Sequence, residues 1–251
     1  MSSAERVAYW LLKEVNRAIR EHDMLRAGDR VAVGVSGGKD SLALLRLLEL
    51  RRRSAPEPFE LAAIHVLGDA SGADMPLHPP LAAWLEQHGV ALHVERMQLG
   101  EGEQPPISCQ RCARNRRRTL FHAARELGCN VLALGHHADD LAETTLMNLV
   151  HNGRVETMAP VRDYFAGAFR LIRPLCYLRE SEIRRLARAA EFPEPPPACP
   201  LGERTARAGA GEMLRLAKRA SPNAVPNLLR AGLRGLSADG FSLDQAGNDL
   251  E

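Results

Sequence analysis

The segment "RVAVGVSGGKDSLALLRLLEL", from Arg30 to Leu50, places glycines, a lysine, an aspartate and two serines between an apolar run and a leucine-rich run. Residues Val31 to Val35 are short, apolar and mostly β-branched, which is typical of a buried parallel strand. The leucines that follow recur at helical spacing, so the polar turn opens a helix. Glycines let a ligand approach the backbone, and the start of a helix favours an anion. The turn therefore predicts a phosphate site.

The Walker A pattern is the first candidate for this loop, and the sequence does not fit it. With Lys39 as its lysine, the first glycine would fall at residue 33, which is valine, and the magnesium-binding hydroxyl at residue 40, which is aspartate. The run "SGGKDS", from Ser36 to Ser41, instead resembles the signature of the PP-loop pyrophosphatases, which transfer AMP from ATP and release pyrophosphate. A glycine turn without a ligand is the alternative to this interpretation.

The cysteines offer a second kind of chemistry. Cys109 and Cys112 form a C-x-x-C pair in "SCQRCARNRRR", and Cys199 lies in the proline-rich "PEPPPACPLGE". Three thiolates can bind three irons of a 4Fe-4S cluster and leave the fourth iron open to a sulfide or a substrate atom. A zinc site completed by a histidine such as His122, or a disulfide from Cys199 to one of the pair, fits the spacing as well.

The remaining two cysteines, Cys129 and Cys176, are flanked by apolar residues, and we interpret both as small buried hydrophobic side chains. A disulfide framework is not expected, because five cysteines is an odd number and the start "MSSAERVAYW" lacks a signal-peptide pattern. The sequence also has no run of eighteen apolar residues. We expect a soluble cytoplasmic protein with no membrane association.

Strand-like and helix-like segments alternate along the chain, which predicts a doubly wound parallel α/β sheet with ligands at the carboxyl ends of its strands. Strands are expected at Val31–Val35, Leu61–Val66, Ala91–Glu95 and Val131–Gly135, and helices at Ala4–Glu21, Ser41–Arg52, Pro80–His88, Arg111–Leu127 and Asp139–His151. Two polar clusters follow strands as the glycine loop does, "IHVLGD" with His65 and "GHHADD" with Asp140. We therefore expect them at the same edge of the sheet.

The charge is distributed unevenly. The formal net charge is +2, but residues 173–234 hold 12 arginines and lysines against 6 acids. This basic excess is compatible with a surface for the phosphates of a nucleic acid, and solvated helix faces explain it equally well. We expect an N-terminal helix over 1–27, an ATP-binding α/β domain over 28–175, a basic helical region over 176–235 with the third cysteine, and a flexible acidic tail over 236–251.

Taken together, these segments resemble the tRNA 2-thiocytidine synthetase family, and the related 2-thiouridine synthetases share much of the pattern. The matching segments, which span about Glu21 to Leu229, are "EHDMLRAGDRVAVGVSGGKDSLALLRLL", "CQRC" with an arginine run, "ALGHHADDLAETTLMNLV", "IRPLCYLRESEI" and a later cysteine after prolines. The resemblance implies a HUP-type fold, a homodimer, tRNA as substrate, ATP with Mg2+, and a 4Fe-4S cluster. A cysteine desulfurase or free sulfide would supply the sulfur.

The resemblance also implies roles for individual residues. The nucleotide site would contain Ser36, Gly37, Gly38, Lys39, Asp40, Ser41, His65, Gly135 and Asp139, and the cluster ligands would be Cys109, Cys112 and Cys199. Arg116 matches a basic active-site position of the 2-thiouridine enzymes. Asp40 and Asp140 are the carboxylates expected to hold Mg2+ or take part in catalysis. For this chemistry the three cysteines must converge beside the Lys39 turn.

The sequence departs from the family pattern in several places. The C-terminal segment has one cysteine where thiocytidine relatives have two, and the segment "GHHRDD" of many relatives is "GHHADD" here, with Ala138 in place of the arginine. The loop "LGDASGADMPLHPP" replaces an aspartate- and glutamine-rich segment. The zinc-ribbon cysteines of the 2-thiouridine branch are absent, which favours the cytidine branch. A 2-thiouridine synthetase, a lysidine-type PP-loop ligase and a non-enzymatic nucleotide and iron-sulfur sensor are the alternatives.

Overall fold

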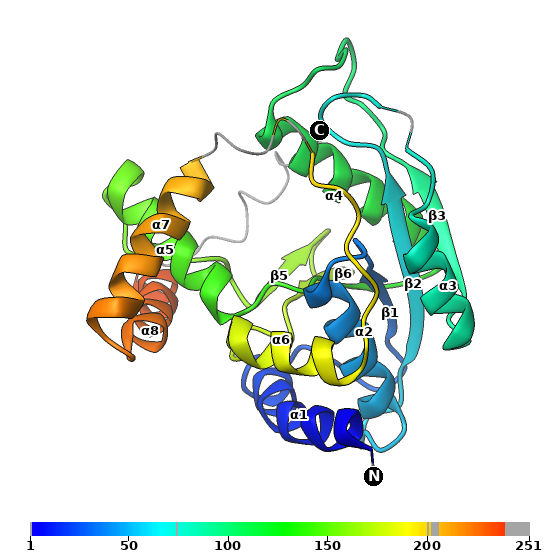
Figure 1. The fold of residues 1–251 in the computed structure, drawn as a ribbon, viewed down its shortest axis with the longest axis horizontal. Coiled ribbons are helices and arrows are strands. Elements are labelled where there is room, and N and C mark those ends of the chain that lie inside the picture. The colour runs from blue at the N-terminus through cyan, green and yellow to red at the C-terminus, as the bar shows by residue number, and fades with distance from the viewer. Residues whose placement is uncertain (1, 74, 200, 202–205, 239–251) are drawn as a thin grey trace.

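A six-stranded sheet organises the chain (Figure 1), and the computed structural model describes residues 2–73, 75–199, 201 and 206–238. The strand order is β3 (Leu92–Arg96), β2 (Glu60–Leu67), β1 (Arg30–Gly34), β4 (Val131–Ala133), β6 (Phe169–Ile172) and β5 (Val161–Tyr164). All neighbouring strands pair in parallel except β5, which runs antiparallel to β6. The doubly wound α/β fold expected from the sequence is confirmed.

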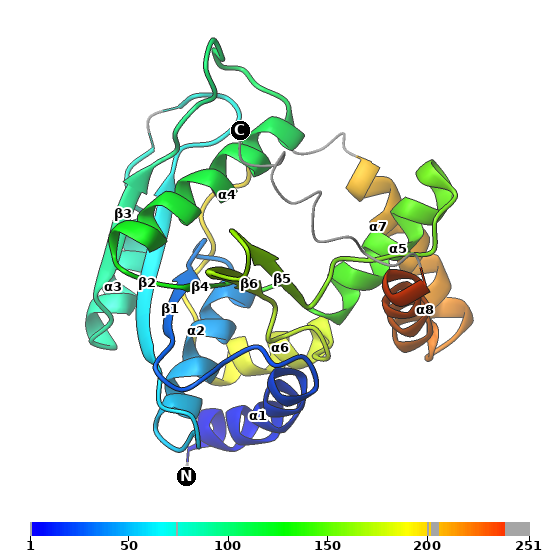
Figure 2. The same ribbon diagram turned by 180° about the vertical axis from the view of Figure 1, so that it is seen from behind.

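Alternating side chains of the strands supply two cores, one on each face of the sheet. In β1, Val31 and Val33 join the larger core, whereas Ala32 points to the smaller one. The larger core is covered by α1 (Ser3–Glu21), α2 (Lys39–Arg52), α3 (Pro79–Gln87) and α6 (Glu180–Ala189), and the smaller one by α4 (Cys109–Glu126). Figure 2 shows α4 lying along the sheet on the face opposite α2.

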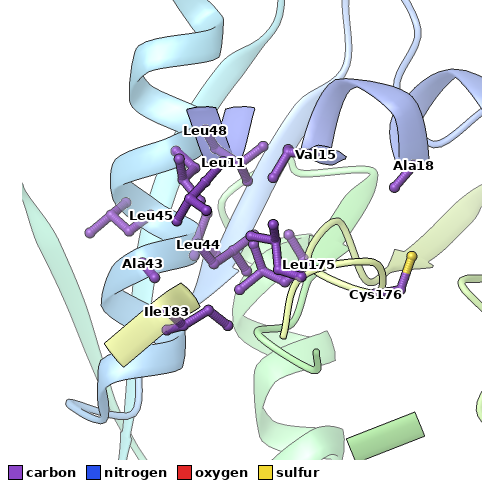
Figure 3. Packing of buried hydrophobic residues seen from close by; sticks show 14 of the residues in the cluster. Leu11, Val15, Ala18, Ala43, Leu44, Leu45, Leu48, Leu175, Cys176 and Ile183 are labelled. Atoms are coloured by element: carbon purple, nitrogen blue, oxygen red, sulfur yellow. The ribbon is translucent and has the colours of Figure 1, made fainter. Parts of the chain in front are cut away.

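Helix α2 is apolar on most of its circumference because other helices cover the side that faces away from the sheet. Its leucines alternate between the sheet and helices α1 and α6, and Leu44, Leu47 and Leu48 are fully buried. Figure 3 shows side chains of α1, α2 and the segment before α6 gathered in one cluster. The helix that begins with the glycine loop is therefore rigidly held, which fixes the loop in front of it.

The last three helices form a group around α5 (Ala138–Asn152). Helices α7 (Ala206–Ala220) and α8 (Ala224–Ala238) both pack against α5 and against each other. Figure 1 shows these three helices side by side at one end of the molecule, with β2 and β3 at the other end. Within residues 176–235, helix α6 is separated from helices α7 and α8 by a non-helical segment that follows Ala189. The acidic tail predicted for 236–251 lies outside the described residues from 239 onward.

The strands and helices expected from hydrophobic periodicity are all present, with ends displaced by one or two residues in most cases. The sequence pattern did not indicate the β5–β6 hairpin. Its strands have four residues each, and its turn places Phe165 and Ala166 at positive φ before Gly167. Phenylalanine and alanine rarely adopt this conformation, so the residue types gave no turn signal.

A buried ion pair joins the amino-terminal ends of the central strands. The Arg170 guanidinium donates to both carboxylate oxygens of Asp29, at 2.7 and 2.6 Å, and both side chains are 4% exposed. Asp29 also accepts hydrogen bonds from the Arg26 backbone amide and the Asn130 side chain. Through these contacts, this aspartate links the loops before β1 and β4 to β6.

We expect Asp29→Asn to lower the free energy of unfolding by about 3–5 kcal/mol, because it leaves a buried guanidinium without its counter-charge. The matched control is Glu60→Gln, which removes an exposed ion pair with Arg30 (2.8 Å) on the neighbouring strand and costs less than about 1 kcal/mol. Urea unfolding of both variants measures the difference. Equal losses in the two variants would contradict the central role of Asp29.

Candidate active site

The glycine loop is preorganised by two serine hydroxyls. Ser41 Oγ donates to the Gly38 carbonyl (2.9 Å) and accepts from the Ser36 backbone amide (3.1 Å). Gly37 lies at φ +85°, a conformation that favours glycine. Gly38 is the N-cap of α2 and has no side chain to cap the helix, so an anion can take that place. The loop has the conformation that a phosphate-binding turn requires.

A second glycine brings another strand end against this loop. A Cβ atom on Gly135 would lie 2.9 Å from the carbonyl carbon and oxygen of Asp40 and 3.1 Å from the Ser41 amide nitrogen. Backbone atoms cannot move aside as a flexible side chain would, so only glycine allows this approach. Gly135, which the sequence assigns to the nucleotide site, therefore sets the distance between the loops after β1 and β4.

A cavity of about 360 Å3 opens above these two loops. Its lining contains apolar and polar side chains. The apolar ones are Ile64, Val66, Leu120 and Leu134, and the polar ones include Ser36, Asp40, Ser41, Arg117, His136 and Asp140. A ligand with an apolar ring and a charged chain needs both kinds of side chain in one site.

Asp40 and Asp140 lie on either side of a buried histidine. His137 Nε2 is 3.6 Å from Asp40 Oδ1 and 3.5 Å from Asp140 Oδ2, and the His137 backbone amide donates to Asp140 Oδ2 at 2.9 Å. Asp40 Oδ1 is buried and has no hydrogen-bond partner among the described residues. An unpaired buried carboxylate oxygen beside a phosphate-binding loop is a ligand that a divalent cation would satisfy.

Lys39 is held by two carboxylates. Its ammonium lies 3.0 Å from Asp40 Oδ2 and 3.2 Å from Glu180 Oε1, which is in the first turn of α6. Burial acts to lower the pKa of Lys39, but the hydrogen bonds to Asp40 and Glu180 raise it above its usual value. The lysine of the loop is therefore charged and oriented at neutral pH.

Asp139, which the sequence assigns to nucleotide binding, faces away from the cavity described above. Its Oδ2 accepts from the Glu180 backbone amide at 2.8 Å, and its Oδ1 pairs with Lys218 of α7. Burial acts to raise the pKa of Asp139, but the Lys218 ammonium and the Glu180 amide lower it below its usual value. Asp139 joins α5, α6 and α7, whereas its neighbour Asp140 lines the nucleotide cavity.

Cys109 and Cys112 occupy the first turn of α4. The Ser108 side chain caps this helix by accepting from the Arg111 amide at 3.2 Å. Cys109 Sγ lies 3.4 Å from the Leu201 carbonyl oxygen, and both thiols are half-buried. Burial raises the pKa of the Cys112 thiol, while the charge of Arg116 acts in the opposite direction. The start of α4 thus meets the segment that follows Cys199.

Cys199 comes to the same place along an extended segment after α6, which Figure 1 shows crossing the carboxyl ends of the strands towards α4. A Cβ on Gly37 would lie 2.9 Å from Pro196, so this proline packs directly on the glycine loop. The Cys199 thiol hydrogen-bonds to Asp69, whose pKa is lowered by Ser71, by Cys199 and by the charge of Arg116, against the effect of burial.

The three cysteines are near one another, but they do not form a closed ligand set. Among the residues that the structure describes, no three histidine, cysteine or acidic side chains are arranged to hold a metal ion. Cys199 lines a second cavity of about 450 Å3, together with Ser36, Gly38, His65, Asp69 and Arg116. Ser36, Val66 and Arg116 line both cavities. The glycine loop therefore borders the nucleotide cavity on one side and the cysteine cavity on the other.

Arg116 and His65 hold the backbone at the edge of the sheet. The Arg116 guanidinium donates to the Val66 carbonyl (2.7 Å) and to the Gly68 carbonyl. His65 Nδ1 lies 2.7 Å from the Val35 carbonyl oxygen, and burial lowers the pKa of this histidine. Both residues line the cavity that also contains Cys199. Their polar atoms brace the strand ends that carry the loops.

Sequence patterns did not assign Glu180, Lys218, Asp69 or Pro196 to the site. Glu180 belongs to "YLRESEI", where an acid in the first turn of a helix has an ordinary explanation. Lys218 is one of only three lysines in the sequence, and this rarity is the feature that could have indicated a specific role for it. Each of these residues meets its partner only through tertiary packing: Glu180 meets Lys39, Lys218 meets Asp139, and Pro196 packs on Gly37.

A mostly parallel sheet with a glycine loop at its switch point, a lysine held by acids and a cavity over that loop defines a PP-loop nucleotide-binding protein. Residues 11–193 match the family model of the PP-loop domain. The chain is 39% identical over 224 residues to the tRNA-cytidine(32) 2-sulfurtransferase of Geobacter metallireducens, with 86% of each chain covered. It is 41% identical over 209 residues to the enzyme of that name from Citrifermentans bemidjiense, with 80% of each covered.

Among solved structures, the chain is similar to the U34-tRNA thiolase NcsA from Methanococcus maripaludis with its 4Fe-4S cluster. The TM-score is 0.73 and the identity 26%, over 91% of this chain and 80% of that one. The chain therefore belongs to the tRNA-cytidine(32) 2-sulfurtransferase family of PP-loop proteins. The family resemblance drawn from the sequence is confirmed.

We expect Gly135→Ala to weaken ATP binding by at least about tenfold, because its methyl group would push the loop after β4 away from Asp40 and Ser41. Gly209→Ala is the matched control, since a Cβ at this helical position meets nothing within 4 Å. Isothermal titration with a non-hydrolysable ATP analogue measures both affinities. Unchanged affinity in Gly135→Ala would contradict the close-approach requirement.

Proposed function

We propose that this chain is an ATP-dependent tRNA sulfurtransferase that replaces the C2 oxygen of a cytidine, at tRNA position 32, with sulfur. The observation that carries the proposal is the shared boundary of two cavities. A nucleotide cavity and a cysteine cavity meet at Ser36, Val66 and Arg116. A base that is activated by ATP in one cavity is then next to the cavity that Cys199 lines.

The first half of the reaction is the transfer of AMP. The pyrimidine C2 oxygen forms a bond to the α-phosphorus of ATP while the bond to pyrophosphate breaks. The oriented amides at the start of α2 and the Lys39 ammonium stabilise the negative charge that develops on the pyrophosphate. Because Asp40 and Glu180 already fix this ammonium, little reorganisation is needed as the charge develops.

The second half of the reaction replaces the activated oxygen. A sulfur nucleophile forms a bond to C2, and the bond from C2 to the adenylated oxygen breaks with release of AMP, a far better leaving group than oxide. Arg116 holds the backbone between the two cavities through the Val66 and Gly68 carbonyls. Its guanidinium also lies beside Cys112, where its positive charge favours the thiolate.

The donor chemistry of Cys109, Cys112 and Cys199 fits a 4Fe-4S cluster, and the described side chains are not arranged as a closed metal site. Thiolates are the ligands that such clusters take, and the three cysteines come together from the start of α4 and from the proline segment beside the glycine loop. A cluster bound by three thiolates supplies an iron with an open coordination position, which is the chemistry required to bring sulfur to the site. Cys129 and Cys176 are buried in the two cores and take no part.

Asp40 and Asp140 fit Mg2+. Asp40 Oδ1 is buried without a hydrogen-bond partner among the described residues, and Asp140 lines the same cavity. A divalent cation there would offset the repulsion between these carboxylates and the phosphates of ATP.

The family membership favours cytidine over uridine, and the cysteine cavity favours thiolation over lysidine-type ligation and over nucleotide sensing. A lysidine-type ligase needs no cysteines beside its nucleotide site, and a sensor needs no space for a base between nucleotide and thiols. The excess of 12 arginines and lysines over 6 acids in residues 173–234 supports contacts of this region with tRNA phosphates. We also propose a homodimer in the cytoplasm, supplied with sulfur by a cysteine desulfurase or by free sulfide. In the described residues, no helix is long and apolar enough to span a membrane.

The function is tested by mass spectrometry of tRNA nucleosides from a deletion strain and from the same strain complemented with this chain. We expect 2-thiocytidine to be lost in the deletion strain and restored by the complement. A loss of 2-thiouridine with 2-thiocytidine intact would reassign the substrate. Unchanged thionucleosides would overturn the function.

Replacement of single cysteines separates the proposed ligands from the other thiols. We expect Cys109→Ser, Cys112→Ser or Cys199→Ser to abolish 2-thiocytidine formation and to lower the iron content of anaerobically purified protein. Cys129→Ala, at a buried position in the smaller core, is the matched control and retains both iron and activity. Full iron content in Cys199→Ser would contradict the assignment of the third ligand.

A further inference from the structure

One carboxylate joins three helices next to the nucleotide cavity. The Asp139 side chain is 5% exposed and lies in the first turn of α5. Its Oδ1 pairs with Lys218 in the last turn of α7, and its Oδ2 accepts from the backbone amide of Glu180 at 2.8 Å. Asp139 therefore fixes the first turn of α6 relative to α5, and Lys218 supplies its counter-charge.

The same network continues to the glycine loop. Asp139 accepts a hydrogen bond from the backbone amide of Glu180. The side chain of the same Glu180 lies 3.2 Å from the Lys39 ammonium. Arg184, one turn later in α6, holds the same Glu180 oxygen at 2.7 Å. A displacement of the α6 start would thus be transmitted to the lysine that faces the phosphates. The contacts run without a break from Lys218 to Lys39.

Charge gives a second reason for a lysine on α7. Asp40, Asp139, Asp140 and Glu180 bring four carboxylates close to a site for a polyphosphate. A buried carboxylate without a partner would either swing out or repel the nucleotide. Lys218 offsets the charge of Asp139, neither residue lines the cavity, and the Lys218 side chain is 36% exposed.

We infer that Lys218 is a positioning residue for the ATP site, acting from the C-terminal helix α7 through Asp139 and Glu180 on the Lys39 ammonium. It does not line the nucleotide cavity itself. The inference deepens the proposed function, because it rests on ATP as the ligand of this cavity. The basic C-terminal region then contributes to nucleotide binding as well as to any contact with tRNA.

The test compares Lys218→Met with Arg219→Met in the full-length protein. Arg219 is adjacent on α7, exposed, and forms no salt bridge with a described residue, so both variants remove one positive charge from the same helix. Affinity for a non-hydrolysable ATP analogue is measured by titration calorimetry without tRNA. We expect Lys218→Met to bind about tenfold more weakly and Arg219→Met to bind within twofold of the unaltered protein.

Four further measurements separate positioning from a general loss of structure. In thiolation assays Lys218→Met should raise the KM for ATP about tenfold and leave kcat within twofold. Lys218→Arg should recover most of the lost affinity, because it keeps the charge. Lys218→Met should add little to the loss in Asp139→Asn, since the network is already broken there. The midpoint of thermal unfolding should be similar in Lys218→Met and Arg219→Met.

Equal ATP affinity in Lys218→Met and Arg219→Met would overturn the inference. So would a Lys218→Met protein that loses only affinity for tRNA, because the lysine would then be a phosphate contact. Because the titration uses no tRNA, its outcome does not depend on the nucleoside that is modified. Unchanged thionucleosides in the deletion strain would contradict the proposed function. The difference in ATP affinity between Lys218→Met and Arg219→Met would still be valid.

Discussion

The site depends on the close contact between two loops at the switch point of the sheet. Strand β1 has β2 on one side and β4 on the other. After β1 the chain continues to β2, and it returns later to form β4. The loops after β1 and β4 therefore begin at neighbouring strand ends and run in different directions. Gly135 allows the second loop to touch the backbone of Asp40, and the phosphate turn and the Asp140 carboxylate then face one cavity. A larger residue at this contact would separate the two halves of the site.

The second constraint is the path of the segment after α6. Helix α6 is anchored by Ile183 and Leu186 in the larger core, and the chain then crosses the strand ends with Pro196 on Gly37. Proline fixes the backbone of an extended segment, so the position of Cys199 is set with little help from secondary structure. The thiols and the nucleotide cavity are adjacent because the same glycine loop forms a wall of both.

The charged side chains of the site are held by one another. Lys39 pairs with Asp40 and Glu180, His137 Nε2 lies near both Asp40 and Asp140, and Lys218 pairs with Asp139. The four carboxylates exceed the two lysines in charge, so a divalent cation would help the cavity to accept a polyphosphate. Asp40 Oδ1 has no hydrogen-bond partner in the described part of the chain, and it is placed where a cation is needed.

The sequence by itself determined the mostly parallel α/β sheet and the glycine turn that begins α2, and it singled out the three cysteines that we propose as ligands. These features depend on local rules: apolar runs form buried strands, glycines before a leucine-rich helix form an anion site, and cysteines outside apolar runs are available for ligation. The family resemblance came from the order of such local motifs. The resemblance assigned both Asp139 and Asp140 to the nucleotide site, because a sequence motif does not distinguish the directions of two adjacent aspartates.

Only the tertiary structure separated these two aspartates, since successive side chains at the start of α5 point in different directions and meet different partners. It also decided the roles of Glu180 and Lys218 and the β5–β6 hairpin. Their contacts join residues that are far apart in the chain, or require positive φ at residues that seldom adopt it. Periodicity and spacing report on neighbours along the chain, and they carry no information about which distant side chain will supply a charge.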